Sequence, residues 1–188
     1  MTIHTIFRGR RGRCIAAFAA VLALVGAGSA RANVPLTPVS TDPFTNATSQ
    51  HATEVEPDTF AFGSTVLATY QVGRFFNGGA SDIGFARSTD GGVTWATSSF
   101  LPGLTFNAGT FSDPSSPYER VSDPSVAYDA KHNTWMISSI PILPSTLVVP
   151  TIFVSRSTDG GATFGNPVQI PPPARKTPST QGVNGDRE

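Results

Sequence analysis

Two nearly identical stretches decide how this chain folds. The first is Arg87-Ser88-Thr89-Asp90-Gly91-Gly92-Val93-Thr94-Trp95, and the second is Arg156-Ser157-Thr158-Asp159-Gly160-Gly161-Ala162-Thr163-Phe164. Six consecutive residues, Arg-Ser-Thr-Asp-Gly-Gly, are identical, and a Thr and an aromatic residue follow at the same spacing. Each copy ends an alternating apolar run, which predicts a strand, a tight turn and a second strand. The chain is therefore expected to contain two hairpins of the same kind.

The residue types of the repeat predict a turn that satisfies its own polar groups. Glycine takes positive φ without a Cβ clash, so Asp-Gly-Gly is a strong hairpin signal. The carboxylates of Asp90 and Asp159 can accept backbone N–H groups of their own turn, and the Ser and Thr hydroxyls can join them. The last aromatic residue, Trp95 or Phe164, is expected to fold back and become buried. A structural role is sufficient to explain the motif.

Around each repeat the sequence predicts a unit of four strands, and no helical periodicity follows residue 32. The first unit covers residues 54–100, with strands expected over 58–62, 65–72, 83–87 and 93–98. The second covers 122–170, with strands expected over 124–128, 134–140, 147–156 and 163–170. The fold class is therefore all-β, with about two four-stranded antiparallel units.

The two units also open alike. Glu56-Pro57-Asp58 begins the first and Asp123-Pro124-Ser125 begins the second, while Gly185-Asp186-Arg187-Glu188, within residues 182–188, would begin a third. Residues 33–53 are rich in Pro, Thr, Ser and Asn, which is typical of a linker or a loosely docked N-terminal strand.

The pattern Ser-x-Asp-x-Gly-x-Thr-Trp resembles the Asp-box, or BNR repeat, of sialidase-like β-propellers. The first copy matches fully and the second has Phe in the Trp place; the matching positions are Ser88, Asp90, Gly92, Trp95, Ser157, Asp159, Gly161 and Phe164. In that family the motif is a structural turn between the outer strands of a blade, away from the active site. The resemblance implies a partial sialidase-like β-propeller over residues 54–188, with its two blades at 54–100 and 122–170.

Two blades cannot close a ring, because a propeller needs roughly four or more. An open pair exposes an apolar sheet face and unpaired strand edges. We therefore expect either an N-terminal fragment of a longer protein or a chain that completes itself by oligomerising.

Residues 1–32 have the composition of a signal peptide. Four Arg residues lie within 8–13, an apolar run covers 15–28, and Ala30-Arg31-Ala32 fits a cleavage site. The run is too short to span a bilayer comfortably, and no second apolar stretch follows. The sequence thus predicts a secreted or periplasmic protein without a membrane span.

The charge of the remaining chain argues against some partners. Residues 1–32 hold five of the thirteen basic residues and none of the thirteen acidic ones, so residues 33–188 carry eight against thirteen, a net charge of −5. A mildly acidic protein is a poor candidate for binding nucleic acid or anionic membranes. Neither His nor Cys residues form a metal-ligand pattern, so we expect no metal and no cofactor.

Candidate site residues follow from the resemblance and from the unit openings. In sialidases an Arg-Ile-Pro motif is followed by a second Arg after the next strand and by an Asp that acts as acid/base. Arg74 and Asp82 match the latter two and are the candidate catalytic residues, whereas Val55-Glu56-Pro57 stands where Arg-Ile-Pro would be. Three residues that open the units would line the central channel and are candidate substrate-binding residues: Glu56, Arg120 and Asp123. The alternatives are a solvated loop Arg, a turn Asp and mutually paired strand caps.

The resemblance implies an exo-sialidase-like glycoside hydrolase that is incomplete in this chain, since the family's later Arg residues, its Glu and its Tyr nucleophile would lie beyond Glu188. The chain alone is then expected to be inactive. The alternative is a non-catalytic secreted Asp-box propeller that binds glycans or proteins. The first hypothesis and the glycan form of the second imply a glycan or glycoconjugate as the partner.

Overall fold

A computed structural model of the chain describes residues 36–96, 98–144 and 149–170. The chain divides into two units, Met1–Thr37 and Pro38–Glu188, and the account below concerns the described residues of the second. The signal peptide predicted over residues 1–32 and the third unit predicted to begin within 182–188 lie outside the described residues.

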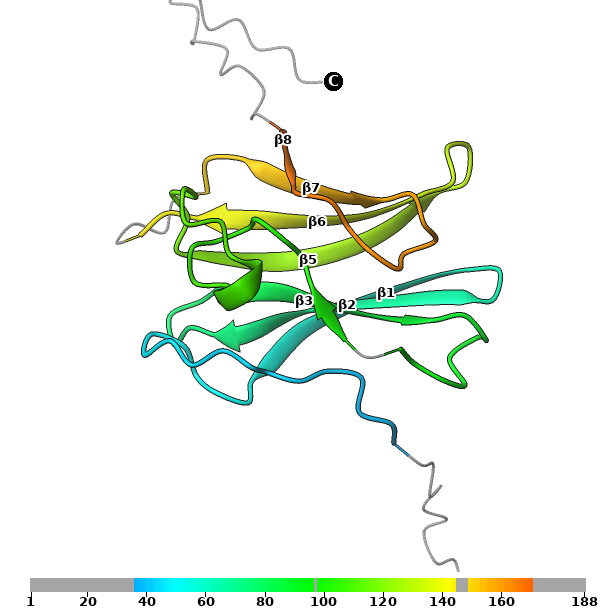
Figure 1. The fold of residues 1–188 in the computed structure, drawn as a ribbon, viewed down its shortest axis with the longest axis horizontal. Helices are drawn as coiled ribbons and strands as arrows, with labels where there is room; N and C mark the ends of the chain where they lie inside the picture. Colours follow the sequence, from blue (N-terminus) through cyan, green and yellow to red (C-terminus); the bar gives the residue numbers. More distant parts are fainter. Residues whose placement is uncertain (1–35, 97, 145–148, 171–188) are drawn as a thin grey trace, which may run out of the picture. The chain divides into compact units, whose positions relative to one another are not determined.

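Eight antiparallel strands form two successive four-stranded blades (Figure 1). The first blade consists of β1 (Glu54–Phe62), β2 (Thr65–Arg74), β3 (Ala80–Ser88) and β4 (Ser99–Phe100). The second consists of β5 (Arg120–Asp129), β6 (Thr134–Ile142), β7 (Ile152–Ser157) and β8 (Val168–Ile170). One 3₁₀ turn, η1 (Gly109–Phe111), lies in the connection between them. The predicted all-β fold, a partial propeller of two four-stranded antiparallel blades, is confirmed.

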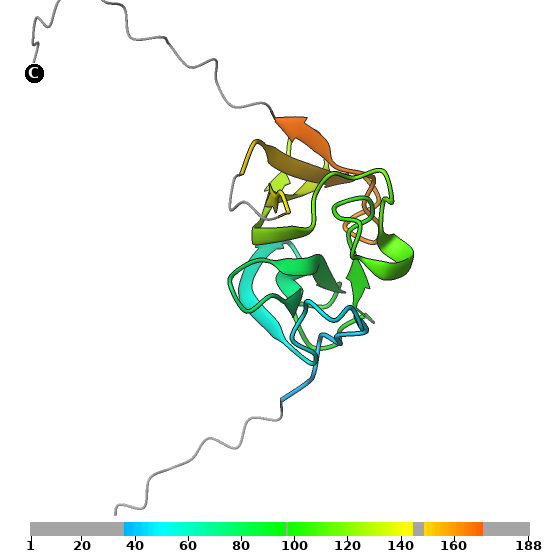
Figure 2. The same cartoon turned by 90° about the vertical axis from the view of Figure 1, so that its left-hand side faces the viewer.

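The two blades lie side by side (Figure 2), and a short β3–β5 pairing joins them into one eight-stranded sheet. Their only ladder contact among the described residues is the pair Ala80 and Val121, which joins β3 to β5. The inner strands β1 and β5 are also linked by a side chain. Asp58 Oδ2 accepts hydrogen bonds from Ser125 Oγ at 2.9 Å and from the Val126 N–H at 2.8 Å. The blades are therefore held together mostly by side chains.

The fourth strand of each blade begins later than the sequence predicted. Strands were expected to begin at residues 93 and 163, but β4 and β8 begin at Ser99 and Val168. The cause is the carboxylate of each repeat, because Asp90 and Asp159 bind the Thr four residues later and hold the chain in a loop. The expected tight turn is thus a longer connection closed by a side chain.

The main core lies between the blades. Leu67, Ile83 and Phe85 of the first blade pack with residues of the second, including Trp135, Ile137 and Phe153. Phe164, the aromatic residue of the second repeat, is buried there and meets the Phe85 ring edge-on, with 4.9 Å between ring centroids. The second repeat therefore stabilises the contact between blades as well as its own turn.

A second apolar cluster packs on the opposite face of the first blade. Side chains alternate across a strand, so Tyr70, Val72 and Ala86 point away from the second blade. Phe44 covers them from the segment that precedes β1, and its ring lies 5.2 Å from that of Phe100. Trp95 of the first repeat packs half-buried against the same cluster.

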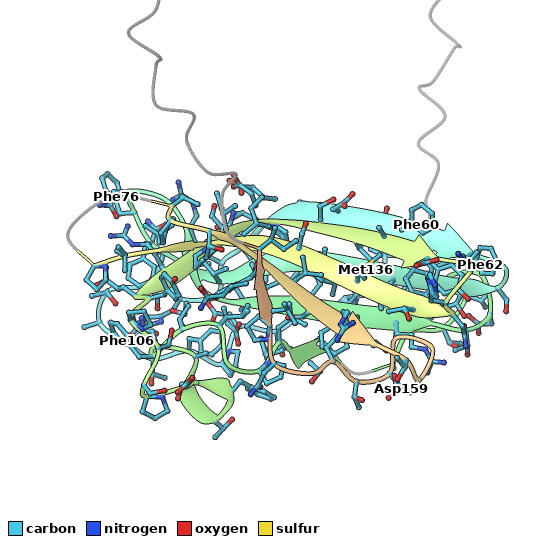
Figure 3. All side chains as sticks on the ribbon, turned by 90° about the horizontal axis from the view of Figure 1, so that it is seen from above. Phe60, Phe62, Phe76, Phe106, Met136 and Asp159 are labelled. Carbon is cyan, nitrogen blue, oxygen red and sulfur yellow. The ribbon has the colours of Figure 1, made fainter. Side chains whose placement is uncertain are left out.

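Figure 3 shows two ends of the strands. Phe60, Phe62 and Asp159 lie at one end, which we call the turn end, because β3 and β7 run into their Asp-Gly-Gly turns there. Phe76 and Phe106 lie at the other end, which we call the loop end. The connection between β2 and β3 and the start of β5 belong to the loop end.

Candidate functional site

Each inner strand contains a β-bulge at its repeated acid-Pro pair. The register shifts between Val55 and Asp58 in β1 and between Ser122 and Ser125 in β5. The acidic residue has positive φ in both, +53° at Glu56 and +50° at Asp123. Non-glycine residues adopt this conformation rarely, and bulges often re-aim a side chain. The repeat thus places two carboxyls at matching positions of neighbouring strands.

The two carboxyls are linked through a chain of four hydrogen-bonded side chains. The Asp123 side chain lies close enough to the Glu56 carboxyl to raise its pKa. Gln71 Nε2 donates to Glu56 and, at 3.2 Å, to Ser122 Oγ. Ser122 Oγ in turn donates to Asp123 Oδ1 at 2.6 Å. Gln71 and Ser122 are buried, whereas both acidic residues are exposed. Two buried side chains therefore hold a pair of accessible carboxyls in place.

A carboxyl that lies beside a second carboxylate loses its proton less readily, because the two negative charges would repel each other. Partial burial of its carboxyl, followed by the neighbouring carboxyl of Asp123, raises the pKa of Glu56. The charge of Arg74 acts against this rise. Arg74 Nη1 also donates to Gln50 Oε1 at 2.9 Å. We call Glu56, Asp123, Gln71, Ser122 and Arg74 the carboxyl site.

Asp82 does not belong to this site. It lies in β3 with no exposed surface, and its Oδ1 accepts the N–H of Ile83 at 2.8 Å. Its Oδ2 has no hydrogen-bond partner among the described residues, and burial raises the pKa of the carboxyl well above its usual value. The expected catalytic pair of Arg74 and Asp82 is not assembled, because Arg74 interacts with Glu56 and the Asp82 carboxyl is enclosed within the fold.

Arg120 is a clamp between blades. Its buried guanidinium donates through Nη1 to Asn77 Oδ1 at 2.6 Å and to the Gly78 carbonyl at 3.0 Å. Nη2 lies 3.2 Å from Glu119 Oε2, and the group stacks 4.9 Å from the centroid of the Phe75 ring. Contrary to the expectation of a substrate-binding Arg, the side chain holds the β2–β3 connection.

The two Asp-Gly-Gly turns have nearly the same hydrogen bonds. Ser88 Oγ donates to Asp90 Oδ1 at 2.8 Å and accepts the Gly92 N–H at 2.9 Å. Ser157 does the same with Asp159 and Gly161, at 2.7 and 2.9 Å. Both glycines have positive φ. Each turn is thus closed by its Ser and its Asp.

The carboxylates of both turns accept hydrogen bonds from the Thr four residues later. Asp90 accepts the N–H of Thr94 at 2.9 Å and its hydroxyl at 2.6 Å, and these bonds lower the pKa of Asp90 to about 2. The equivalent bonds from Thr163 lower the pKa of Asp159. Trp95 Nε1 donates to the Gly92 carbonyl at 3.2 Å. The turns belong to the turn end, whereas the carboxyl site belongs to the other end of the strands.

Sequence reasoning named three members of the carboxyl site and missed two. The repeated acid-Pro pair and the resemblance pointed to Glu56, Asp123 and Arg74, whereas nothing local marks Gln71 or Ser122. Within the described ranges, no three His, Cys, Asp or Glu side chains are grouped so that they could hold a metal ion. No helix in those ranges has the length and apolar character that crossing a membrane requires.

The chain was compared with known proteins. No protein-family model matches it, and no curated protein is similar at the level of sequence. Among solved structures it is similar to the Hadza microbial sialidase Hz136, with 26% identity and a TM-score of 0.48 over 61% of this chain and 25% of that one. A putative exo-β-1,3-galactanase from Bifidobacterium bifidum is similar with 15% identity and a TM-score of 0.42, over 61% of this chain and 35% of that one.

An exo-β-1,3-galactanase from Clostridium thermocellum is similar with 13% identity and a TM-score of 0.43, over 71% of this chain and 27% of that one. The chain spans between a quarter and about a third of the length of these three proteins.

Proposed function

We propose that this chain is part of a carbohydrate-active β-propeller and that its carboxyl site binds a glycan. The observation that supports this is the pair of carboxyls of Glu56 and Asp123, linked through Gln71 and Ser122, on matching bulges of adjacent inner strands. Carboxyl oxygens accept hydrogen bonds from sugar hydroxyls, and a protonated carboxyl can also donate one. Because Gln71 and Ser122 hold the two carboxyls in place, less conformational entropy is lost when a ligand binds.

The more specific form of the proposal is an exo-sialidase-like hydrolase. Arg74 interacts with Glu56, and a guanidinium is suited to receive the carboxylate of a sialoside. Glu56 has a raised pKa, as a general acid requires near neutral pH. On this form of the proposal the nucleophile comes from elsewhere, as in sialidases that use a Tyr.

A non-catalytic glycan-binding propeller is the second candidate. Paired catalytic carboxyls normally lie about 5–5.5 Å or 6.5–9.5 Å apart, with the glycosidic bond between them. Glu56 and Asp123 are instead joined through the side chains of Gln71 and Ser122, which hold the two carboxyls together and not on opposite sides of a glycosidic bond. On this form of the proposal the chain binds its glycan and leaves it intact.

Calorimetric titration with sialyllactose and with lactose tests the proposal, because the two ligands differ only in the sialyl residue. We expect Glu56→Gln and Asp123→Asn each to weaken binding about tenfold, the amount expected for one or two lost charge-assisted hydrogen bonds. Arg74→Gln should remove any preference for sialyllactose over lactose. Asp129→Asn is the matched control, because Asp129 lies at the opposite end of the same strand and accepts only local N–H groups and His132.

Equal binding by the parent and both carboxyl variants, or no binding of either sugar, would refute the glycan site. Release of a fluorogenic sialoside by the parent and its loss in Glu56→Gln would favour the hydrolase. Binding without release would favour the binder.

A further inference from the structure

Phe76 is almost fully exposed, whereas nine of the sixteen aromatic residues in the described ranges are buried. Its side chain is 83% exposed, while that of the adjacent Phe75 is 3% exposed. Leaving a Phe in water forgoes roughly 1.5–3 kcal/mol that burial would contribute. A single exposed apolar side chain is common and marks no site by itself. What distinguishes Phe76 is how the turn that carries it is held and what lies beside it.

The turn that carries Phe76 is held from several sides. Phe75 donates its N–H to the Gly79 carbonyl at 2.8 Å and accepts the Gly78 N–H at 3.2 Å. The Arg120 guanidinium binds the two residues after Phe76, Asn77 and Gly78, and stacks on Phe75. A side chain from the second blade therefore fixes a first-blade turn whose outermost ring faces solvent.

This ring lies at the same end of the strands as the carboxyl site. Phe76 follows Arg74 by two residues, so their Cα atoms are at most about 7 Å apart. Arg74 itself interacts with Glu56. Figure 3 shows Phe76 at the loop end, away from Asp159 and the Asp-Gly-Gly turns.

We propose that Phe76 is a stacking platform for the apolar C–H face of a pyranose ring whose hydroxyls are held by the carboxyl site. This rests on the proposed function. The face of an aromatic ring is negative and attracts the weakly positive C–H groups of a sugar, while its area excludes water from the contact. Binding sites for small ligands typically combine such an apolar surface with a few fixed polar groups that set orientation. The clamped turn keeps the ring in place before the ligand arrives, which limits the entropy lost on binding.

Substitutions at Phe76 and the titrations with sialyllactose and lactose test the assignment. We expect Phe76→Ala and Phe76→Leu each to weaken binding about tenfold, and Phe76→Trp to retain it, because an aromatic face and not apolar volume is required. Asn77→Ala removes one acceptor of the clamp and should weaken binding about threefold. The three Phe76 variants should unfold at the parent's urea concentration within error, because Phe76 is exposed. Asn77→Ala should lower that concentration, because it removes a hydrogen-bond partner of the buried Arg120 guanidinium.

A second readout is independent of affinity. Sugar C–H protons stacked on the ring should shift upfield in the NMR spectrum of the bound ligand, and the shift should be absent with Phe76→Leu. Parent-like affinity in Phe76→Ala, with binding lost in Glu56→Gln, would overturn the platform and leave the proposed function standing. Absence of glycan binding by the parent would overturn both.

Discussion

Replacing Ser157 by Ala should destabilise the fold far more than replacing its neighbour Ser155. Both serines are on β7, two residues apart and hence on one face, and they are 2% and 1% exposed. Ser157 Oγ accepts the N–H of the buried Gly161 and donates to Asp159. Ser155 Oγ has no partner among the described residues. Comparing the two variants therefore separates the stability contributed by a hydroxyl that closes a turn from that contributed by a buried hydroxyl alone.

The size of the difference follows from these hydrogen bonds. Ser157→Ala leaves a buried N–H unpaired, at a cost of about 1–3 kcal/mol, and removes a bond to a charged group. Ser155→Ala removes an unpaired polar atom and should leave stability within about 0.5 kcal/mol of the parent or raise it. In urea unfolding, with a slope of about 1–3 kcal/mol/M, Ser157→Ala should lower the midpoint by roughly 1 M. Ser88→Ala should lower it less, because Gly92 is only half-buried. Equal midpoints for Ser157→Ala and Ser155→Ala would refute the structural role of the turn.

Two further predictions concern burial. Burial raises the pKa of Asp82, so the folded chain keeps a proton that the unfolded chain releases near pH 4. The free energy of unfolding therefore falls as the pH rises above about 4. The fall is on the order of 1 kcal/mol per pH unit until the folded-state pKa is reached. Asp82→Asn should therefore gain on the parent between about pH 4 and 7. Asp129 has a lowered pKa, so Asp129→Asn should lose on the parent only as the pH rises toward about 4 and should differ from it by a constant amount above that. Urea midpoints across pH decide, and a pH-independent difference for Asp82→Asn contradicts the assignment. Phe44→Ala should lower the free energy of unfolding by about 3 kcal/mol, because the ring is 6% exposed and holds the N-terminal segment on the first blade. Phe76→Ala should leave it almost unchanged. Similar urea midpoints for the two variants would show that the segment is not docked.

The sequence predicts the blades because their signals are local. Strand alternation, paired glycines and the repeated Arg-Ser-Thr-Asp-Gly-Gly act over a few residues and recur 69 positions apart, at Ser88 and Ser157. The start of the fourth strands was wrong because Asp90 and Asp159 compete with strand pairing through side-chain hydrogen bonds to a Thr. Periodicity contains no such information.

The site was less predictable because it depends on register between blades. The sequence shows that Glu56 and Asp123 occupy equivalent positions in the two units. Their proximity, however, requires two equivalent bulges on adjacent inner strands. The role of Gln71 follows only from its position in β2 opposite Val55. Asp82, within Ser81-Asp82-Ile83, has the composition of a turn and yet lies in the buried part of strand β3. The long-range fold, and not local chemistry, sets its environment.

One measurement tests most directly whether the loop end of the blades is a carbohydrate site. Amide resonances of the folded chain would be followed by NMR during titration with sialyllactose. We predict saturable shifts at Gln71, Arg74, Phe76 and Asp123, with the amide of Gly161 in the second turn unmoved. Shifts centred on the Asp-Gly-Gly turns, or none at saturating sugar, would contradict a glycan site built on the paired carboxyls.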